Sequence, residues 1–174
     1  MTIEDVIHRI GEIGIVPVVR AATVEDATSA VEAICAGGIP ILEITMTVPN
    51  AASVIRHLAR EYGSTVLLGA GTVTTAEQAE QCIGAGAEFI VSPGLSLPVL
   101  GVARARARLA IPGALTPTEV MNAQENGAKL IKIFPCGNVG GPKYLRSLRA
   151  QTLRHGSREA ASFLIALVKC RGVT

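Results

Sequence analysis

Six short apolar runs, each followed by a segment with helical periodicity or a turn, constrain the fold of this chain more than any other feature. The runs are rich in Val, Ile and Leu, and polar, Gly or Pro residues follow them. Alternation of this kind predicts repeated βα units around a parallel sheet. The expected strands are residues 14–20, 41–47, 66–72, 89–94, 107–113 and 130–135.

Helical segments precede the first run and separate the later ones. The clearest begins with the N-cap residue Thr23, has Asp26 three residues on, and closes on Gly37 and Gly38. These are start and stop signals of a helix. The expected helices are residues 2–12, 23–38, 50–63, 75–87, 96–106 and 117–126.

The last part of the chain departs from this alternation. After residue 142 the sequence is predicted to be helical almost throughout, and the length of the apolar run 161–170 favours a buried helix over a strand. A chain of 174 residues has room for one domain of average size. We therefore predict a single α/β domain over 1–174, with about six parallel strands and a terminal helical segment over 150–174.

Charge and cysteine usage exclude several classes of protein. The 16 basic and 14 acidic residues are mostly interspersed and give a net charge of +2, so no nucleic-acid footprint is indicated. A local basic excess at 143–158 is either a solvated helix face or an anion site. The four cysteines form no metal-binding motif and are typical of a reduced cytoplasmic protein. No apolar run reaches the length of a membrane helix, and the first residues do not resemble a signal peptide.

Polar residues at the ends of the predicted strands are the candidates for chemistry, because working groups of parallel α/β folds gather at the carboxyl ends of strands. Strand alternation places Glu43, Thr45 and Thr47 on one face. The same rule places Lys132 with Leu130 and Phe134. The full candidate set is Arg20, Glu43, Thr45, Thr47, Thr72, Ser92, Thr116 and Lys132.

Lys132 is unexpected in an apolar strand and has two interpretations. Burial favours the neutral amine of a lysine, which can attack a ketone carbonyl and form a Schiff base. Glu43 is the right type of residue to carry the protons of that reaction. Alternatively, Lys132 and Glu43 form a structural buried ion pair. The pattern alone leaves both interpretations open.

Three neighbouring features are also open at this stage. Arg20 either caps a nearby carboxylate or binds a substrate carboxylate with its guanidinium. The Gly-Ala-Gly-Thr segment 69–72 is either a strand end built from small residues or a weak phosphate-binding signal. Cys136 is expected to be a packed thiol rather than a nucleophile.

Six segments carry a resemblance to a known family. They are GIVPVVR, GGIPILEITMTVPNA, LLGAGTVT, GAEFIVSPGL, IPGALTPTEV and GAKLIKIFPCGNVGGPKYLRSLR. In order and spacing they resemble the bacterial 2-keto-3-deoxy-6-phosphogluconate (KDPG) and 4-hydroxy-2-oxoglutarate aldolases, over residues 1 to about 149. The resemblance implies a TIM-barrel-type fold, a homotrimer, and a class I aldolase that needs no metal or cofactor. It also implies a 2-keto acid substrate that is cleaved to pyruvate and an aldehyde.

The resemblance also implies roles for single residues. Lys132 corresponds to the Schiff-base lysine of the family and Glu43 to its general acid/base. Thr47 stands where some members use an Arg to bind the pyruvyl carboxylate, so Arg20 is expected to serve instead. The other matching pocket positions are Thr72, Pro93 and Phe134.

The C-terminal part departs from the family pattern. Seventh and eighth strands follow the sixth helix in the family, whereas here residues 150–174 resemble a shortened, atypical version of its final helix. We therefore expect a truncated barrel that lacks the phosphate site and has an open edge between its first and sixth strands. The alternative is an impaired or inactive deletion variant that acts at most as an oligomeric scaffold. A doubly wound nucleotide-binding sheet is disfavoured, because no Gly-rich turn follows the first strand.

Overall fold

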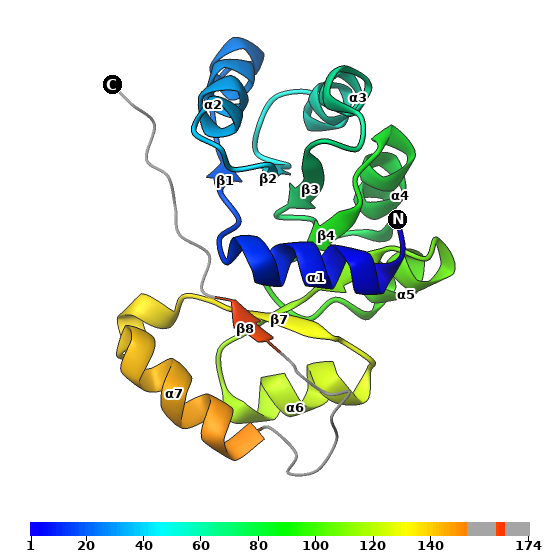
Figure 1. Ribbon diagram of the computed structural model, residues 1–174. Coiled ribbons are helices and arrows are strands. Elements are labelled where there is room, and N and C mark those ends of the chain that lie inside the picture. Colours follow the sequence, from blue (N-terminus) through cyan, green and yellow to red (C-terminus); the bar gives the residue numbers. More distant parts are fainter. Residues whose placement is uncertain (153–162, 166–174) are drawn as a thin grey trace.

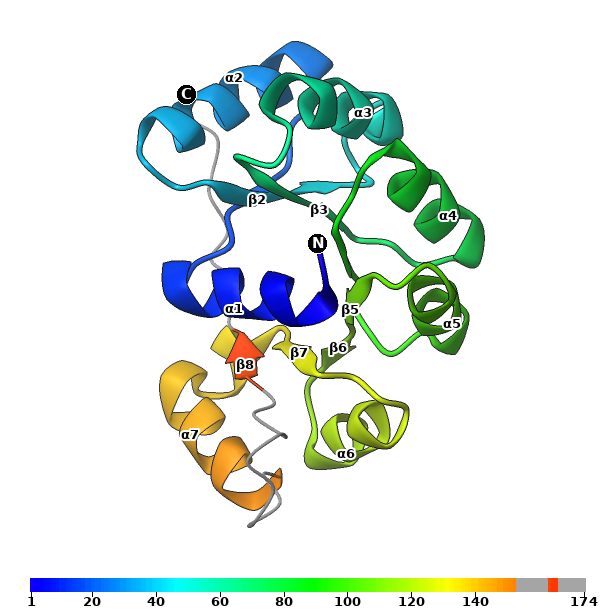
Figure 2. The same cartoon turned by 45° about the vertical axis from the view of Figure 1, so that its right-hand side comes forward.

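The computed structural model describes residues 1–152 and 163–165 of the chain. Short parallel strands form its interior, and helices lie around them (Figures 1 and 2). The strands are β1 (Val18–Val19), β2 (Ile41–Thr45), β3 (Leu67–Gly71), β4 (Phe89–Val91), β5 (Leu109–Ile111), β6 (Gly113–Ala114), β7 (Leu130–Ile133) and β8 (Phe163–Ile165). The helices are α1 (Ile3–Ile13), α2 (Val24–Ala36), α3 (Ala51–Tyr62), α4 (Ala76–Ala85), α5 (Leu97–Ala105), α6 (Pro117–Glu125) and α7 (Gly141–Thr152), with the 3₁₀ turn η1 (Cys136–Val139).

The strands follow one another in sequence order, in one sheet of β1 to β5 and a second of β6 to β8. Every pairing is parallel. This confirms the predicted α/β class and each of the six expected strand regions, although β1 is shorter than its predicted range. Pro17 has no N–H to pair, but its carbonyl still accepts a hydrogen bond of 2.9 Å from the Glu43 N–H.

The fifth predicted strand, 107–113, is divided in the structure. Pro112 lacks the N–H that a continuous ladder requires, so β5 ends before it and β6 begins after it. The Pro112 carbonyl nevertheless accepts a hydrogen bond of 2.9 Å from the Lys132 N–H. The backbone of the lysine strand is therefore fixed by Pro112 and by β6, where the Ala114 carbonyl accepts a hydrogen bond of 3.0 Å from the Phe134 N–H.

The prediction for the C-terminal apolar run is wrong at residues 163–165. Instead of a helix they form β8, which pairs in parallel with β7 and sets residue 165 opposite Lys132. Short apolar runs fit a helix or a strand equally well by periodicity, and a free strand edge supplies unpaired backbone groups that favour the strand. The expected open edge beside the lysine strand is therefore occupied by β8. The rest of the terminal segment, 153–162 and 166–174, lies outside the described residues.

The two faces of the strands carry different cores. Leu42 and Ile44 of β2 belong to an outer cluster with α2, α3 and α4, whereas Ile41 of the same strand belongs to an inner cluster. Strand β7 divides in the same way, because Leu130 is in the inner cluster and Ile131 packs outward with α6 and α7. The inner cluster is Val6, Ile10, Val16, Ile41, Leu67, Phe89, Val91, Leu109, Ile111 and Leu130.

Helix α1 closes the amino ends of the strands. Its buried residues Val6 and Ile10 join the inner cluster. The Arg9 guanidinium donates to the carbonyls of Ser64 and Thr65 at 3.2 and 3.1 Å, just before β3. A Glu4 to Lys129 ion pair joins the same helix to the start of β7. The apolar filling therefore lies toward this end and leaves the carboxyl ends for polar groups.

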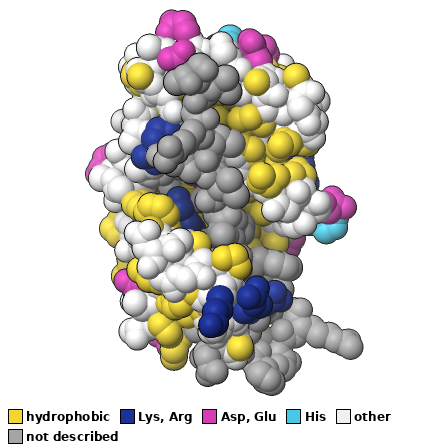
Figure 3. Space-filling view, turned by 90° about the vertical axis from the view of Figure 1, so that its left-hand side faces the viewer, with side chains coloured by type: hydrophobic (Ala, Val, Ile, Leu, Met, Phe, Trp, Pro, Cys, Tyr) yellow, Lys and Arg dark blue, Asp and Glu magenta, His cyan; other side chains and the backbone are white. Residues whose placement is uncertain are grey.

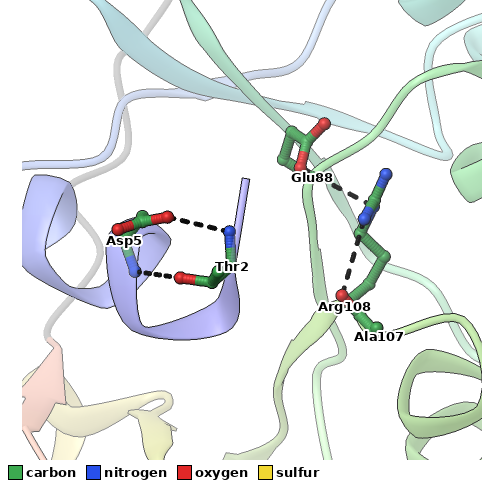
Figure 4. Close-up of polar contacts among 5 residues, drawn as sticks. All are labelled: Thr2, Asp5, Glu88, Ala107 and Arg108. Atoms are coloured by element: carbon green, nitrogen blue, oxygen red, sulfur yellow. Dashed lines mark hydrogen bonds and ion pairs between the residues drawn. The ribbon is translucent and has the colours of Figure 1, made fainter.

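Polar contacts hold this closed end (Figure 4). Thr2 and Asp5 form a capping box at the start of α1, each accepting from the backbone N–H of the other. Glu88 and Arg108, which precede β4 and β5, form an ion pair of 3.6 Å. The Arg108 side chain also donates to the Ala107 carbonyl at 3.5 Å. These contacts lie at the end of the strands opposite to the candidate residues.

Ala107 adopts a φ of +51°, a region that costs an L-residue with a Cβ about 1–2 kcal/mol. Replacing Ala107 with Gly is therefore expected to raise the free energy of unfolding by about 0.5–1 kcal/mol after the entropy cost of glycine. Urea denaturation measures the change. The control is A105G in the last turn of α5, which is expected to destabilise the protein by a similar amount. Equal destabilisation by both substitutions would contradict the prediction.

Candidate functional site

Glu43 and Lys132 lie on the inner face of the strands, above the apolar filling. Each is two residues beyond an inner-cluster residue of its own strand, Ile41 for Glu43 and Leu130 for Lys132. Since side chains alternate along a strand, the polar pair shares the inner face. The structure thus places the two predicted chemical groups on the inner faces of β2 and β7, which belong to different sheets, and toward the carboxyl ends of these strands.

The Glu43 carboxyl group is fully buried, with 0% of the residue exposed. Neither of its oxygens has a hydrogen-bond partner among the described residues. Burial raises the pKa of Glu43 to about 7, although the positive charges of Lys132 and Arg20 act in the opposite direction. A carboxyl group with a pKa near neutrality can both donate and accept a proton in the same reaction cycle.

Lys132 is half-buried in the middle strand of the β6, β7 and β8 sheet. Burial lowers the pKa of its ammonium group; Glu43 opposes this shift and Arg20 adds to it. Its Nζ lies 5.1 Å from the centroid of the Phe134 ring, which is 51% exposed. The amine therefore lies between the interior and a partly solvated aromatic ring, where its neutral form is more accessible than in water.

The predicted alternative of a buried ion pair is not what the geometry shows. Among the described residues, the Glu43 oxygens make no hydrogen bond, and the ion pairs within 4.0 Å do not include Glu43 or Lys132. Glu43 and Lys132 influence each other's pKa by their charges, without a direct contact.

Arg20 is exposed directly after β1, and its charge reaches both Glu43 and Lys132. Thr45 ties the neighbouring strand to this point, because its buried hydroxyl donates to the Val19 carbonyl at 3.1 Å. The Thr47 hydroxyl lies 2.7 Å from that of Thr45. Since Thr45 has one hydrogen and uses it for Val19, Thr47 must be the donor between the two. The strand-end pattern included Thr45 as a candidate, but its contact with β1 could not be read from the sequence.

Thr72 follows β3 directly and has a φ of +58°. A β-branched residue in this region is a backbone outlier, and such strain is concentrated at functional sites. Pro93 is exposed after β4, and its carbonyl would be 2.1 Å from a Cβ at Gly113. Thr72 and Pro93 therefore lie at the predicted strand ends, each in a constrained backbone.

Two candidates have local structural roles instead. The buried Ser92 hydroxyl donates to the Gly94 carbonyl at 2.7 Å and stabilises the turn after β4. Thr116 is the N-cap of α6 and forms a capping box with Glu119. Cys136 packs against the outer cluster of α6 and α7, as the sequence predicts. These residues hold the elements around the site.

The Gly-Ala-Gly-Thr segment 69–72 is a close-packed strand end. A Cβ at Gly69 would lie 2.2 Å from the Phe89 ring, and one at Gly71 would lie 2.4 Å from Glu43 Oε1. Both glycines thus make room for side chains of neighbouring strands. The sequence offered close packing or phosphate binding for this segment, and the contacts of the described residues match the packing interpretation.

The basic residues of the C-terminal region that the structure describes are solvated. Lys143, Arg146 and Arg149 are exposed on α7. Figure 3 shows Lys and Arg side chains gathered at the lower end of the face where this helix lies. The remainder of the basic region falls outside the described residues. Among the residues that are described, no three His, Cys, Asp or Glu side chains are grouped to hold a metal, and no helix is long and apolar enough to cross a membrane.

The raised pKa of Glu43 gives a testable pH dependence of stability. The folded state keeps the Glu43 proton up to about pH 7, whereas the unfolded state keeps it only up to about pH 4.5. The contribution of Glu43 to the free energy of unfolding therefore falls as the pH rises from about 4.5 to about 7. E43Q is therefore expected to gain about 3 kcal/mol of stability relative to wild type between about pH 4 and about pH 8. Urea denaturation at several pH values measures this. The exposed control E125Q should follow the wild-type curve, and parallel curves for E43Q and wild type would contradict the prediction.

Comparison with known proteins supplies the family. Residues 6–153 match the sequence profile of a family described as KDPG and KHG aldolase. The 2-dehydro-3-deoxy-phosphogluconate aldolase of Treponema pallidum is 40% identical over 134 residues, which cover 77% of this chain and 63% of the relative. The chain thus spans less than two thirds of the length of that relative.

Solved structures agree with this assignment. The KDPG aldolase of Zymomonas mobilis ZM4, crystallised with 3-phosphoglycerate, superposes with a TM-score of 0.81 at 28% identity, covering 97% of this chain and 77% of that one. A KDPG aldolase of Legionella pneumophila, with pyruvate captured as a covalent carbinolamine, has a TM-score of 0.72 at 33% identity and covers 79% and 66%. The fold is of the TIM-barrel type, as expected. The chain belongs to the KDPG and KHG aldolase family.

Proposed function

We propose that this chain is a class I aldolase, a lyase that works through a Schiff base on Lys132. The proposed reactions are cleavage of KDPG to pyruvate and glyceraldehyde 3-phosphate, and of 4-hydroxy-2-oxoglutarate to pyruvate and glyoxylate. The observation that carries the proposal is the buried, unbonded Glu43 carboxyl on the same inner face as the half-buried Lys132. The family match and the carbinolamine of the Legionella relative support it.

The chemistry follows from these two groups. The neutral Lys132 amine attacks C2 of the 2-keto acid, and Glu43 transfers the protons that allow the carbinolamine to lose water. The resulting iminium withdraws electrons from the C3–C4 bond. As that bond breaks, the Glu43 carboxylate takes the C4 hydroxyl proton and the aldehyde leaves. The electron pair of the broken C3–C4 bond moves toward the iminium and forms an enamine. Glu43 then returns the proton to C3, and water hydrolyses the imine to pyruvate and free amine.

We assign binding of the substrate carboxylate to Arg20 and Thr72. The Arg20 charge already acts on both reacting groups, and the strained Thr72 follows β3, the strand that pairs with the Glu43 strand β2. Thr47 supports this choice, because its hydroxyl hydrogen is engaged with Thr45 and its free lone pairs repel a carboxylate. Pro93 and Phe134 are exposed beyond the carboxyl ends of β4 and β7, and we assign them to the wall of the substrate pocket.

Other properties implied by the family remain proposals. We propose a homotrimer in the cytoplasm that needs neither metal nor cofactor and binds neither nucleic acid nor membrane. The predicted loss of the phosphate site concerns the segment around β8, of which only residues 163–165 are described. It stays a prediction, with the expected consequence that phosphorylated substrate binds poorly.

Borohydride reduction in the presence of labelled pyruvate tests the Schiff base. A stable adduct is expected on the peptide that contains Lys132, identified by mass spectrometry. K132R should give no adduct and lose at least about a thousandfold in aldol cleavage, because the attacking amine is gone. The matched control is K129R, three residues earlier in an exposed ion pair, which should keep the adduct. A folded wild-type protein without an adduct would support the scaffold alternative.

The role of Arg20 is tested by R20Q. Loss of a charge-assisted contact with the carboxylate is expected to weaken pyruvate binding about ten- to a hundredfold, with trapping still occurring at saturating pyruvate. The pyruvate concentration for half-maximal trapping measures the effect. R106Q serves as the control, since Arg106 pairs with Glu80 on the helical exterior. Unchanged half-saturation in R20Q would assign the carboxylate to another residue.

A further inference from the structure

Gly71, the last residue of β3, lies directly against the carboxyl group of Glu43. A Cβ at position 71 would lie 2.4 Å from Glu43 Oε1, 2.7 Å from Cδ and 3.3 Å from Cγ. In the pairing of β2 with β3, Glu43 lies opposite Gly69 and Thr45 opposite Gly71. The Glu43 side chain therefore leans along the strand direction toward the carboxyl end, into the space that Gly71 leaves open.

The backbone gives no other reason for glycine at this position. Gly71 is not among the residues with positive φ in the described chain, so any L-residue could adopt its conformation. Glycine inside a strand also costs stability, because it gains conformational entropy when unfolded and contributes no side-chain packing. What position 71 requires is the absence of a side chain on the inner face.

The position of the Glu43 carboxyl depends on this contact. Among the described residues its oxygens have no hydrogen-bond partner that would fix them. The group is fully buried, and the bare backbone of Gly71 leaves open the space next to its Oε1 and Cδ.

We propose that Gly71 is a positioning residue, whose missing side chain holds the Glu43 carboxyl where it can exchange protons with an imine on Lys132. The proposal rests on the proposed aldolase function for its kinetic consequence. Gly69 provides the contrast within the same strand, since it makes room for the Phe89 ring and not for a reacting group. A misplacement of about 1 Å in a reacting group can cost about a hundredfold in rate.

The test adds a methyl group at position 71 with G71A and removes a methylene group at position 43 with E43D, first separately and then together. G71A is expected to lower kcat about ten- to a hundredfold with little change in KM, because the added methyl displaces the carboxyl group and leaves the carboxylate pocket intact. E43D alone is slower because its carboxyl is one methylene shorter. In the E43D background the methyl of G71A meets a shorter side chain, whose remaining Cγ lies at the looser distance of 3.3 Å, so adding G71A should cost much less than it does beside Glu43. G69A is the control and should lower activity equally in both backgrounds.

A second measurement does not depend on catalysis. Titration of the Glu43 carboxyl, followed by carbon NMR in protein with labelled glutamate, is expected to have its midpoint near 7 in wild type. The midpoint should move in G71A and stay in place in G69A. If G71A does not fold, adding E43D should restore the fold of G71A, whereas adding E43D to G69A should bring no gain in stability.

The outcomes separate the two proposals. Wild-type protein with no turnover and no pyruvate adduct overturns the aldolase function, and a moved Glu43 midpoint in G71A still supports placement by Gly71. Active wild-type protein in which G71A costs the same in the Glu43 and E43D backgrounds overturns the role of Gly71. An unmoved midpoint in folded G71A also overturns it.

Discussion

A fully buried carboxyl group without a hydrogen-bond partner is the constraint on which the candidate site depends. Hydrogen-bond donors would normally stabilise the charge of Glu43, and none from the described residues reaches the oxygens of this buried group. Two cations nearby offset part of this cost, which leaves the pKa near neutrality rather than far above it. The fold thus maintains the carboxyl group that we propose as the proton carrier at a cost in stability, and functional sites commonly require such a cost.

The division of each strand into two faces makes this burial possible. Outward residues such as Leu42 and Ile131 pack against the helices and hold the strands in place. Inward residues fill the amino ends with apolar side chains that α1 covers. The polar residues follow two positions later on the same inner face. Stability and chemistry are therefore separated along the strand axis, as in other parallel barrels.

The sequence predicted the strands, helices and strand-end residues because these depend on local periodicity and capping. It did not predict β8, since three apolar residues fit a helix as well as a strand until the edge of β7 is known. It offered close packing or phosphate binding for the segment that contains Gly71, but it showed neither the contact of Gly71 with Glu43 nor the hydroxyl contact of Thr45, because both depend on atoms of a neighbouring strand. Such contacts follow from register, and periodicity within one segment does not encode register.

The charge of Arg20 acts to lower the pKa of both reacting groups, and both effects favour the proposed chemistry. It lowers the pKa of the Lys132 ammonium and so favours the neutral nucleophile. It also lowers the pKa of Glu43 from the value that burial alone would give, so that the carboxyl can release its proton near neutral pH. A bound substrate carboxylate would neutralise part of this charge. Glu43 would then hold its proton more tightly when a substrate needs an acid, and loss of the carboxylate with the product would reverse the change.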